Sequence, residues 1–141
     1  SWVFNELLAR RVADGSFDRA LDGDLLNTDM HGTEVTPLGV LWGRGREQVS
    51  GEALRRQQES LRTIKTPDSQ QTLAEVCEEL EFAGVDRGQR AMRVRPWDIA
   101  CEQDRGAATL TLSFCLPVGA YATVLLGQWF ELKDMSLDQA A

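Results

Sequence analysis

Arginine is the residue type in this sequence that is best suited to ligand chemistry. The chain has 13 arginines but only two lysines, Lys65 and Lys133. Four of the arginines lie within nine residues and lead into a Pro-Trp pair: Arg87, Arg90, Arg93 and Arg95. Guanidinium groups at this density can contact backbone phosphates and stack on unpaired bases. A solvated face, ion-paired with nearby acidic residues, explains the same run.

A second arginine pair lies in the segment Gly43-Arg44-Gly45-Arg46. Its backbone N–H groups and two guanidinium groups could bind a phosphate. The segment lacks the Gly-x-x-x-x-Gly-Lys-Ser/Thr pattern, which argues against a nucleotide-binding loop. A turn with solvated arginines is the simpler interpretation, and both interpretations stay open at this stage.

Catalytic and metal-binding templates find little support. His31 is the only histidine, and no serine, cysteine or second ligand is spaced to make it a triad base or a metal ligand. The three cysteines are odd in number and have no Cys-x-x-Cys spacing, so they predict neither a disulfide framework nor a zinc cluster. The sequence therefore predicts no metal and no cofactor, and a reducing, cytoplasmic setting.

Composition excludes further classes. The chain has 141 residues, of which 43% are hydrophobic and 26% are charged, as in a folded globular domain. Its net charge of -7 has the wrong sign for a protein that coats nucleic acid by bulk attraction, so a polyanion site must be local. No apolar stretch approaches the ~20 residues that cross a bilayer, and the start has no secretory signal pattern.

Three helices are expected to position these residues. Phe4, Leu7 and Leu8 have helical spacing, which predicts a helix over residues 1–12, and because the first residue is not Met we expect a piece of a longer protein. Residues 52–64 are rich in helix formers. Apolar positions over residues 73–84 fall on one face, which places Cys77 in a core rather than in a reactive site.

The strands are expected mainly in the second half. Residues 21–26 predict a turn into a short strand, and residues 27–45 an irregular loop with at most a short strand. Residues 91–95 and 97–102 are strand candidates, and residues 109–116 form the clearest one, with alternate apolar positions on a core face. A turn at 117–119 then leads into an apolar helix over 120–132 and a frayed tail over 134–141. This order predicts an α+β fold.

Five stretches, in order along the chain, are similar to motifs of one enzyme family. They are the opening helix with its Phe4-Asn5 pair, Asp22-Gly23-Asp24-Leu25-Leu26-Asn27, Leu41-Trp42-Gly43-Arg44-Gly45, Arg90-Ala91-Met92-Arg93-Val94-Arg95-Pro96 and Leu116-Pro117-Val118-Gly119-Ala120-Tyr121-Ala122-Thr123. The last motif, which follows an alternating strand, is fairly specific. By these motifs the chain resembles the tRNA pseudouridine synthase D (TruD) family over nearly its whole length.

The resemblance implies that this chain is the rear part of an enzyme. The family's nucleophilic aspartate lies in an upstream Gly-x-Lys-Asp segment, which this sequence does not contain. Asp86-Arg87 superficially resembles the Asp-Arg pair of other pseudouridine synthases, but its position matches the connection before the Arg-rich strand. The implied fold is the second half of a family-specific inserted domain over residues 1–108, followed by the closing strand and helix of the catalytic domain over 109–133.

The resemblance also implies a reaction and its participants. The enzyme would isomerise a uridine of tRNA, uridine 13 in the family, to pseudouridine by flipping the base out, without metal or organic cofactor. The implied partners are tRNA and the missing N-terminal part, with no DNA and no membrane. The expected active-site wall is Leu116, Pro117, Gly119, Tyr121 and Ala122. The expected RNA contacts are Arg44, Arg46, Arg90, Arg93 and Arg95.

Two departures and two alternatives accompany the resemblance. Gly127-Gln128 stands where the family usually has Arg-Glu, which puts an ion pair or RNA contact there in doubt, and Val40 stands where proline is usual. A non-catalytic RNA-binding or protein-interaction module that retains the fold is one alternative. A generic α+β domain with chance matches is the other.

Overall fold

The computed structural model describes residues 1–28, 32 and 34–133, so the predictions for His31 and for the tail over 134–141 lie outside the described residues. The chain divides into two compact units, residues 1–93 and residues 94–141. Among the described residues, the first unit contains three helices and one sheet, and the second contains a hairpin and a short helix. This confirms the prediction of a mixed α+β structure.

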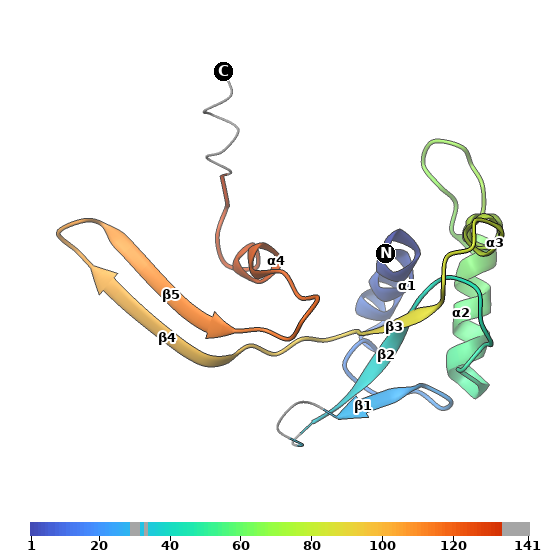
Figure 1. Cartoon of the computed structure of the whole chain (residues 1–141), viewed down its shortest axis with the longest axis horizontal. Helices are drawn as coiled ribbons and strands as arrows, with labels where there is room; N and C mark the ends of the chain where they lie inside the picture. Colours follow the sequence, from blue (N-terminus) through green and yellow to red (C-terminus); the bar gives the residue numbers. More distant parts are fainter. Residues whose placement is uncertain (29–31, 33, 134–141) are drawn as a thin grey trace. The chain divides into compact units, whose positions relative to one another are not determined.

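The sheet of the first unit is antiparallel, with strand order β1-β2-β3 (Figure 1). Its strands are β1 (Leu26–Thr28), β2 (Val35–Leu41) and β3 (Gly88–Ala91). The register pairs Leu26 with Pro37 on one side of β2 and Leu38 with Ala91 on the other. Strands β2 and β3, which are about fifty residues apart in the sequence, thus lie side by side.

The helices of this unit are α1 (Trp2–Ala13), α2 (Gly51–Thr63) and α3 (Leu73–Phe82). Helix α1 packs against β2 and α2, and α2 packs against α3. The buried core cluster joins all three helices: Val3, Leu61, Leu73 and Cys77. Burial raises the pKa of the Cys77 thiol to about 12. The expected helices and the core position of Cys77 are confirmed.

Strand β2 corrects the prediction of an irregular loop over residues 27–45. Gly39 is needed in this strand because a Cβ there would lie 2.6 Å from the Phe4 ring, so glycine lets α1 pack closely on the sheet. Pro37 is buried in the strand and accepts a hydrogen bond from the Met92 N–H. Gly39 and Pro37 are residue types typical of loops, but here they allow packing within a strand.

The strand expected over residues 91–95 is displaced, because β3 covers residues 88–91 instead. Met92 donates its N–H to the Pro37 carbonyl at 2.9 Å, but proline has no N–H with which to return the bond. The ladder between β2 and β3 ends at this point. Arg93 and Arg95 consequently lie outside any strand.

The second unit is built on a two-stranded antiparallel hairpin. Its strands are β4 (Trp97–Asp104) and β5 (Thr109–Cys115), with an irregular register between Trp97 and Ala100. The predicted alternation is present at Leu112 and Phe114, which are half-buried between exposed neighbours, and Leu116 is half-buried beside the half-buried Pro117. The expected core face is not formed within this unit, since these side chains are only partly covered.

Helix α4 (Ala122–Leu126) is much shorter than the helix expected over residues 120–132. Gly127 follows it directly, and glycine is less favourable than alanine in a helix by about 1 kcal/mol. Trp129 and Leu132, which made the sequence pattern apolar, are exposed and provide no packing that would extend the helix. None of the helices in the described part of the chain has the length and hydropathy needed to span a bilayer.

Candidate nucleic-acid interface

Residues 43–47, here called the arginine loop, pair with the segment that precedes β3. The Arg44 N–H donates to the Val85 carbonyl at 2.7 Å, and the Arg87 N–H donates to the Arg44 carbonyl at 3.0 Å. Gly43 permits this approach, because a Cβ at that position would lie 2.4 Å from the Asp86 backbone. The fold therefore brings Arg44 and Arg46 next to Arg87.

Two side chains of the arginine loop face solvent. The Arg44 side chain is 61% exposed and donates to the Gly84 carbonyl at 3.2 Å. Its carboxylate neighbour, Asp86, is 3.5 Å away and 89% exposed, so this ion pair is weak. Arg46 is exposed and forms no side-chain hydrogen bond or ion pair with the described residues. Both guanidinium groups are accessible to a phosphate.

Arg87 has a different environment from its neighbours. Its guanidinium lies 4.2 Å from the centroid of the Trp42 ring and pairs with Glu47 at 3.2 Å. Its side chain is 9% exposed. Trp42 in turn donates its indole N–H to Glu81 at 2.9 Å. Arg87 thus binds protein groups on several sides.

Arg90 and Arg93, two further predicted RNA contacts of the first unit, have other neighbours than the arginine loop. The Arg90 guanidinium lies over the Phe4 ring at 5.3 Å and is half-buried. Arg93 forms an ion pair with Glu34 at 2.6 Å. Arg93 follows Arg87 by six residues along a largely extended segment, so the two are separated by about 20 Å at ~3.3 Å per residue. Arg95 is exposed and belongs to the second unit.

The predicted active-site wall forms one corner of the second unit, between β5 and α4. Leu116 and Pro117 are half-buried there, and Gly119 adopts a positive φ of 88°. A Cβ at Gly119 would meet nothing within 4 Å, so backbone conformation rather than packing favours glycine within this unit. Tyr121 is 67% exposed, and Ala122 begins α4 in an exposed position. The corner presents an open face.

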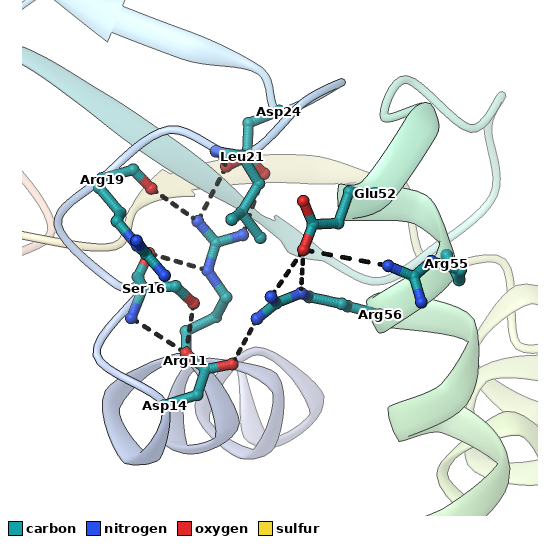
Figure 2. Close-up of polar contacts among 9 residues, drawn as sticks. All are labelled: Arg11, Asp14, Ser16, Arg19, Leu21, Asp24, Glu52, Arg55 and Arg56. Atoms are coloured by element: carbon teal, nitrogen blue, oxygen red, sulfur yellow. Dashed lines mark hydrogen bonds and ion pairs between the residues drawn. The ribbon is translucent and has the colours of Figure 1, made fainter.

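Sequence reasoning missed a buried ion pair in the first unit (Figure 2). Arg11 donates to both carboxylate oxygens of Asp24, at 3.1 and 2.8 Å, and to the carbonyls of Ser16 and Arg19. The two side chains are 9% and 2% exposed. Arg11 follows Phe4 by seven positions and therefore lies on the same face of α1, which is the sequence signal of its burial.

A more exposed polar network joins α1 to α2 beside this pair (Figure 2). Arg56 contacts Asp14 at 2.6 Å and Glu52 at 2.6 Å. A hydrogen bond from the Ser16 hydroxyl lowers the pKa of Asp14, and the Glu52 contact raises the pKa of Arg56. These contacts connect the two helices and leave Arg56 already paired.

A cavity of about 510 Å³ lies next to this network, among α1, α2 and β2. Its lining includes the apolar side chains of Phe4, Leu8 and Leu38 and the basic side chains of Arg10 and Arg55. Sequence reasoning did not predict this cavity. Within residues 1–28, 32 and 34–133, no group of three or more His, Cys, Asp or Glu side chains is arranged to hold a metal ion.

The chain is similar in sequence to a known protein family and to several of its named members. Residues 26–128 match the family model described as tRNA pseudouridine synthase D (TruD). A protein of Methylococcus capsulatus named tRNA pseudouridine synthase D is 32% identical over 149 residues, covering 93% of this chain and 39% of the relative. Proteins of the same name from Xanthomonas campestris strain 8004 and Hydrogenovibrio crunogenus are 34% and 31% identical, covering 95% and 94% of this chain.

The chain spans about two fifths of the length of these relatives: 39% of the Methylococcus and Xanthomonas proteins and 40% of the Hydrogenovibrio protein. The family match extends from β1 through α4, so it includes the arginine loop, the Arg-rich segment and the corner at Tyr121. The resemblance inferred from the motifs is confirmed, and the chain belongs to the tRNA pseudouridine synthase D family.

Proposed function

We propose that this chain is the C-terminal part of a tRNA pseudouridine synthase and contributes RNA contacts and part of the active-site wall. The observation that carries the proposal is the family match over residues 26–128, together with relatives of that name that align with more than nine tenths of the chain. The substrate is a uridine in tRNA, and uridine 13 is the proposed target.

The proposed reaction breaks the N-glycosidic bond of uridine and rejoins the base to the ribose through carbon. The attacking aspartate would come from the part of the enzyme outside this chain, and we propose no cofactor. Extruding the base from the folded RNA requires a few kcal/mol, which contacts to the flipped base and to the backbone must offset. Arg44 and Arg46 would contact phosphates, while Tyr121 and its neighbours would line the base pocket.

The exposed apolar surface of the second unit supports this role. Val118, Tyr121, Val124 and Trp129 are all exposed around the corner and α4. An isolated two-stranded hairpin is at best marginally stable in water, so this unit requires further packing. We propose that the remainder of the enzyme covers this surface and that residues 109–133 complete its catalytic domain, with residues 1–108 belonging to the inserted domain.

Cellular setting and partners follow as part of the same proposal. Cys77, Cys101 and Cys115 are free thiols, which suits a reducing cytoplasm. The proposed partners are tRNA and the N-terminal part of the enzyme. Arg90, Arg93 and Arg95 remain proposed RNA contacts, although Arg90 and Arg93 would have to exchange their present neighbours for phosphate.

A chimera tests the proposal. The segment of the Methylococcus capsulatus relative that aligns with this chain would be replaced by residues 1–141, and pseudouridine in unmodified tRNA would be measured by nucleoside chromatography. We expect the chimera to form pseudouridine and the 141-residue chain alone to form none. Activity of the isolated chain would contradict the placement of the nucleophile. A folded but inactive chimera, with tRNA binding retained, would favour a non-catalytic RNA-binding module.

A further inference from the structure

Arg87 joins the arginine loop to the segment before β3 through contacts in three directions. Its guanidinium stacks on Trp42, the residue that directly precedes the loop, with 4.2 Å to the ring centroid. One terminal nitrogen donates to the Gly45 carbonyl at 3.5 Å, and the other contacts Glu47 at 3.2 Å, at the end of the loop. A single side chain therefore touches the residue before the loop, the middle of the loop and its last residue.

The backbone alone holds only part of this loop. Arg44 is fixed by the two backbone hydrogen bonds to Val85 and Arg87, but no backbone pair of this kind holds Gly45 or Arg46 within the described residues. Gly45 has a φ of 149°, and a Cβ added there would lie 3.2 Å from the Arg87 Cβ. Between Arg44 and Glu47 the backbone of the loop therefore lies against the Arg87 side chain.

The burial of Arg87 separates its role from that of a direct phosphate contact. Its side chain is 9% exposed, whereas Arg44 is 61% exposed and Arg46 faces solvent. A phosphate that bound Arg87 would have to displace both the Trp42 ring and Glu47. Arg44 would give up only exposed contacts, a hydrogen bond to the Gly84 carbonyl and a weak ion pair with Asp86. Arg44 and Arg46 are therefore the groups that RNA reaches.

We propose that Arg87 is a positioning residue for RNA binding: it fixes the arginine loop so that Arg44 and Arg46 meet adjacent backbone phosphates, and it does not itself touch RNA. This inference rests on the proposed function of the chain in tRNA binding. Its distinctive consequence is that Arg87 acts only through the two exposed arginines. Replacing Arg87 should therefore have no effect on the affinity for RNA once Arg44 and Arg46 are absent.

The test measures binding of the 141-residue chain to labelled, unmodified tRNA by fluorescence anisotropy over a range of KCl concentrations. Each phosphate contact contributes about one unit to the slope of log affinity against log salt. We expect the double variant Arg44→Ala/Arg46→Ala to lower that slope by about two. Arg87→Lys keeps the charge but cannot provide the planar fork and stack, and we expect it to lower the slope as well.

Coupling between the sites is the decisive readout. In the Arg44→Ala/Arg46→Ala background, Arg87→Lys should leave both affinity and slope unchanged. Circular dichroism and the urea midpoint of each variant would establish that the chain is folded, and Arg55→Lys in α2 provides a matched charge-preserving control. Arg87→Met removes the charge as well and should give the same result in that background; if it unfolds the chain, Arg87→Lys still decides the question.

The failures are distinguishable. If the Arg44→Ala/Arg46→Ala variant binds tRNA with the wild-type slope, or if the wild-type chain does not bind, the proposed RNA contacts fail and this inference falls with them. If that variant loses slope but Arg87→Lys retains it, or weakens binding equally in both backgrounds, the RNA contacts stand and the positioning role of Arg87 is overturned.

Discussion

Replacing Arg11 by methionine should strongly destabilise the first unit. The Arg11 guanidinium makes four hydrogen bonds, and its removal leaves the Asp24 carboxylate, 2% exposed, without its cation. Removing one partner of a buried ion pair destabilises a protein by about 3–5 kcal/mol. Asp24 keeps a hydrogen bond from the Leu21 N–H at 2.8 Å, so we expect the lower end of this range.

Urea unfolding followed by far-UV circular dichroism measures this loss, because α1, α2 and α3 provide most of the helical signal. With an m-value of about 1.5 kcal/mol/M, a loss of about 3 kcal/mol lowers the midpoint by about 2 M.

The double variant Arg11→Met/Asp24→Leu is the control. It removes both charges, so its midpoint should recover toward that of the wild type. A loss below about 1 kcal/mol for Arg11→Met would show that the pair is solvated like a surface pair, contrary to the burial described here.

Two further perturbations test the first unit. The Ser16 hydroxyl lowers the pKa of Asp14 from 3.8. The hydrogen bond between them therefore contributes fully to stability above that pH, and the contribution is lost as the pH falls through the folded-state pKa. The free energies of unfolding of Ser16→Ala and of the wild type, measured at several pH values, should differ most near neutrality and converge in acid. Gly39→Ala places a Cβ 2.6 Å from the Phe4 ring and should destabilise by about 1–3 kcal/mol in urea unfolding. Gly88→Ala, whose nearest contact is 3.7 Å, is the matched control, and equal losses in the two variants would contradict the close packing of α1 on β2.

Local sequence signals predicted the three helices of the first unit well, because their information lies within one or two turns. Thr72 and Glu75 form a capping box at the start of α3, and the apolar spacing from Leu73 to Cys77 gives the buried face. The sequence predicted at most a short strand where the seven-residue β2 lies, because the features that disfavour a strand, Pro37 and Gly39, are explained only by neighbours distant in the sequence. The Phe4 ring and the Met92 N–H supply those explanations.

In the second unit the sequence pattern predicted a longer helix than the structure has. Its sequence pattern predicted an alternating strand, which is present, and a long apolar helix, which ends at Leu126. An apolar pattern predicts that a surface will be covered, but helix length depends on whether the covering partner is there to pack against it. Gly127 therefore ends the helix in a unit whose Trp129 and Leu132 side chains are exposed.

The roles of the arginines depend on long-range pairing in the same way. In the sequence, Arg87 is one of four similar cations, and nothing local distinguishes it from Arg93. Its partners Trp42 and Glu47 lie 45 and 40 positions earlier in the sequence. Because of these contacts, Arg87 is a packed side chain and not an exposed candidate for RNA contact. The local signal that accompanies this pairing is Gly43, whose missing side chain permits the backbone approach. The acidic surplus has a related consequence: carboxylates pair with Arg87 and Arg93 within the fold, whereas Arg44 and Arg46 stay exposed, so the arginine loop keeps accessible positive charge.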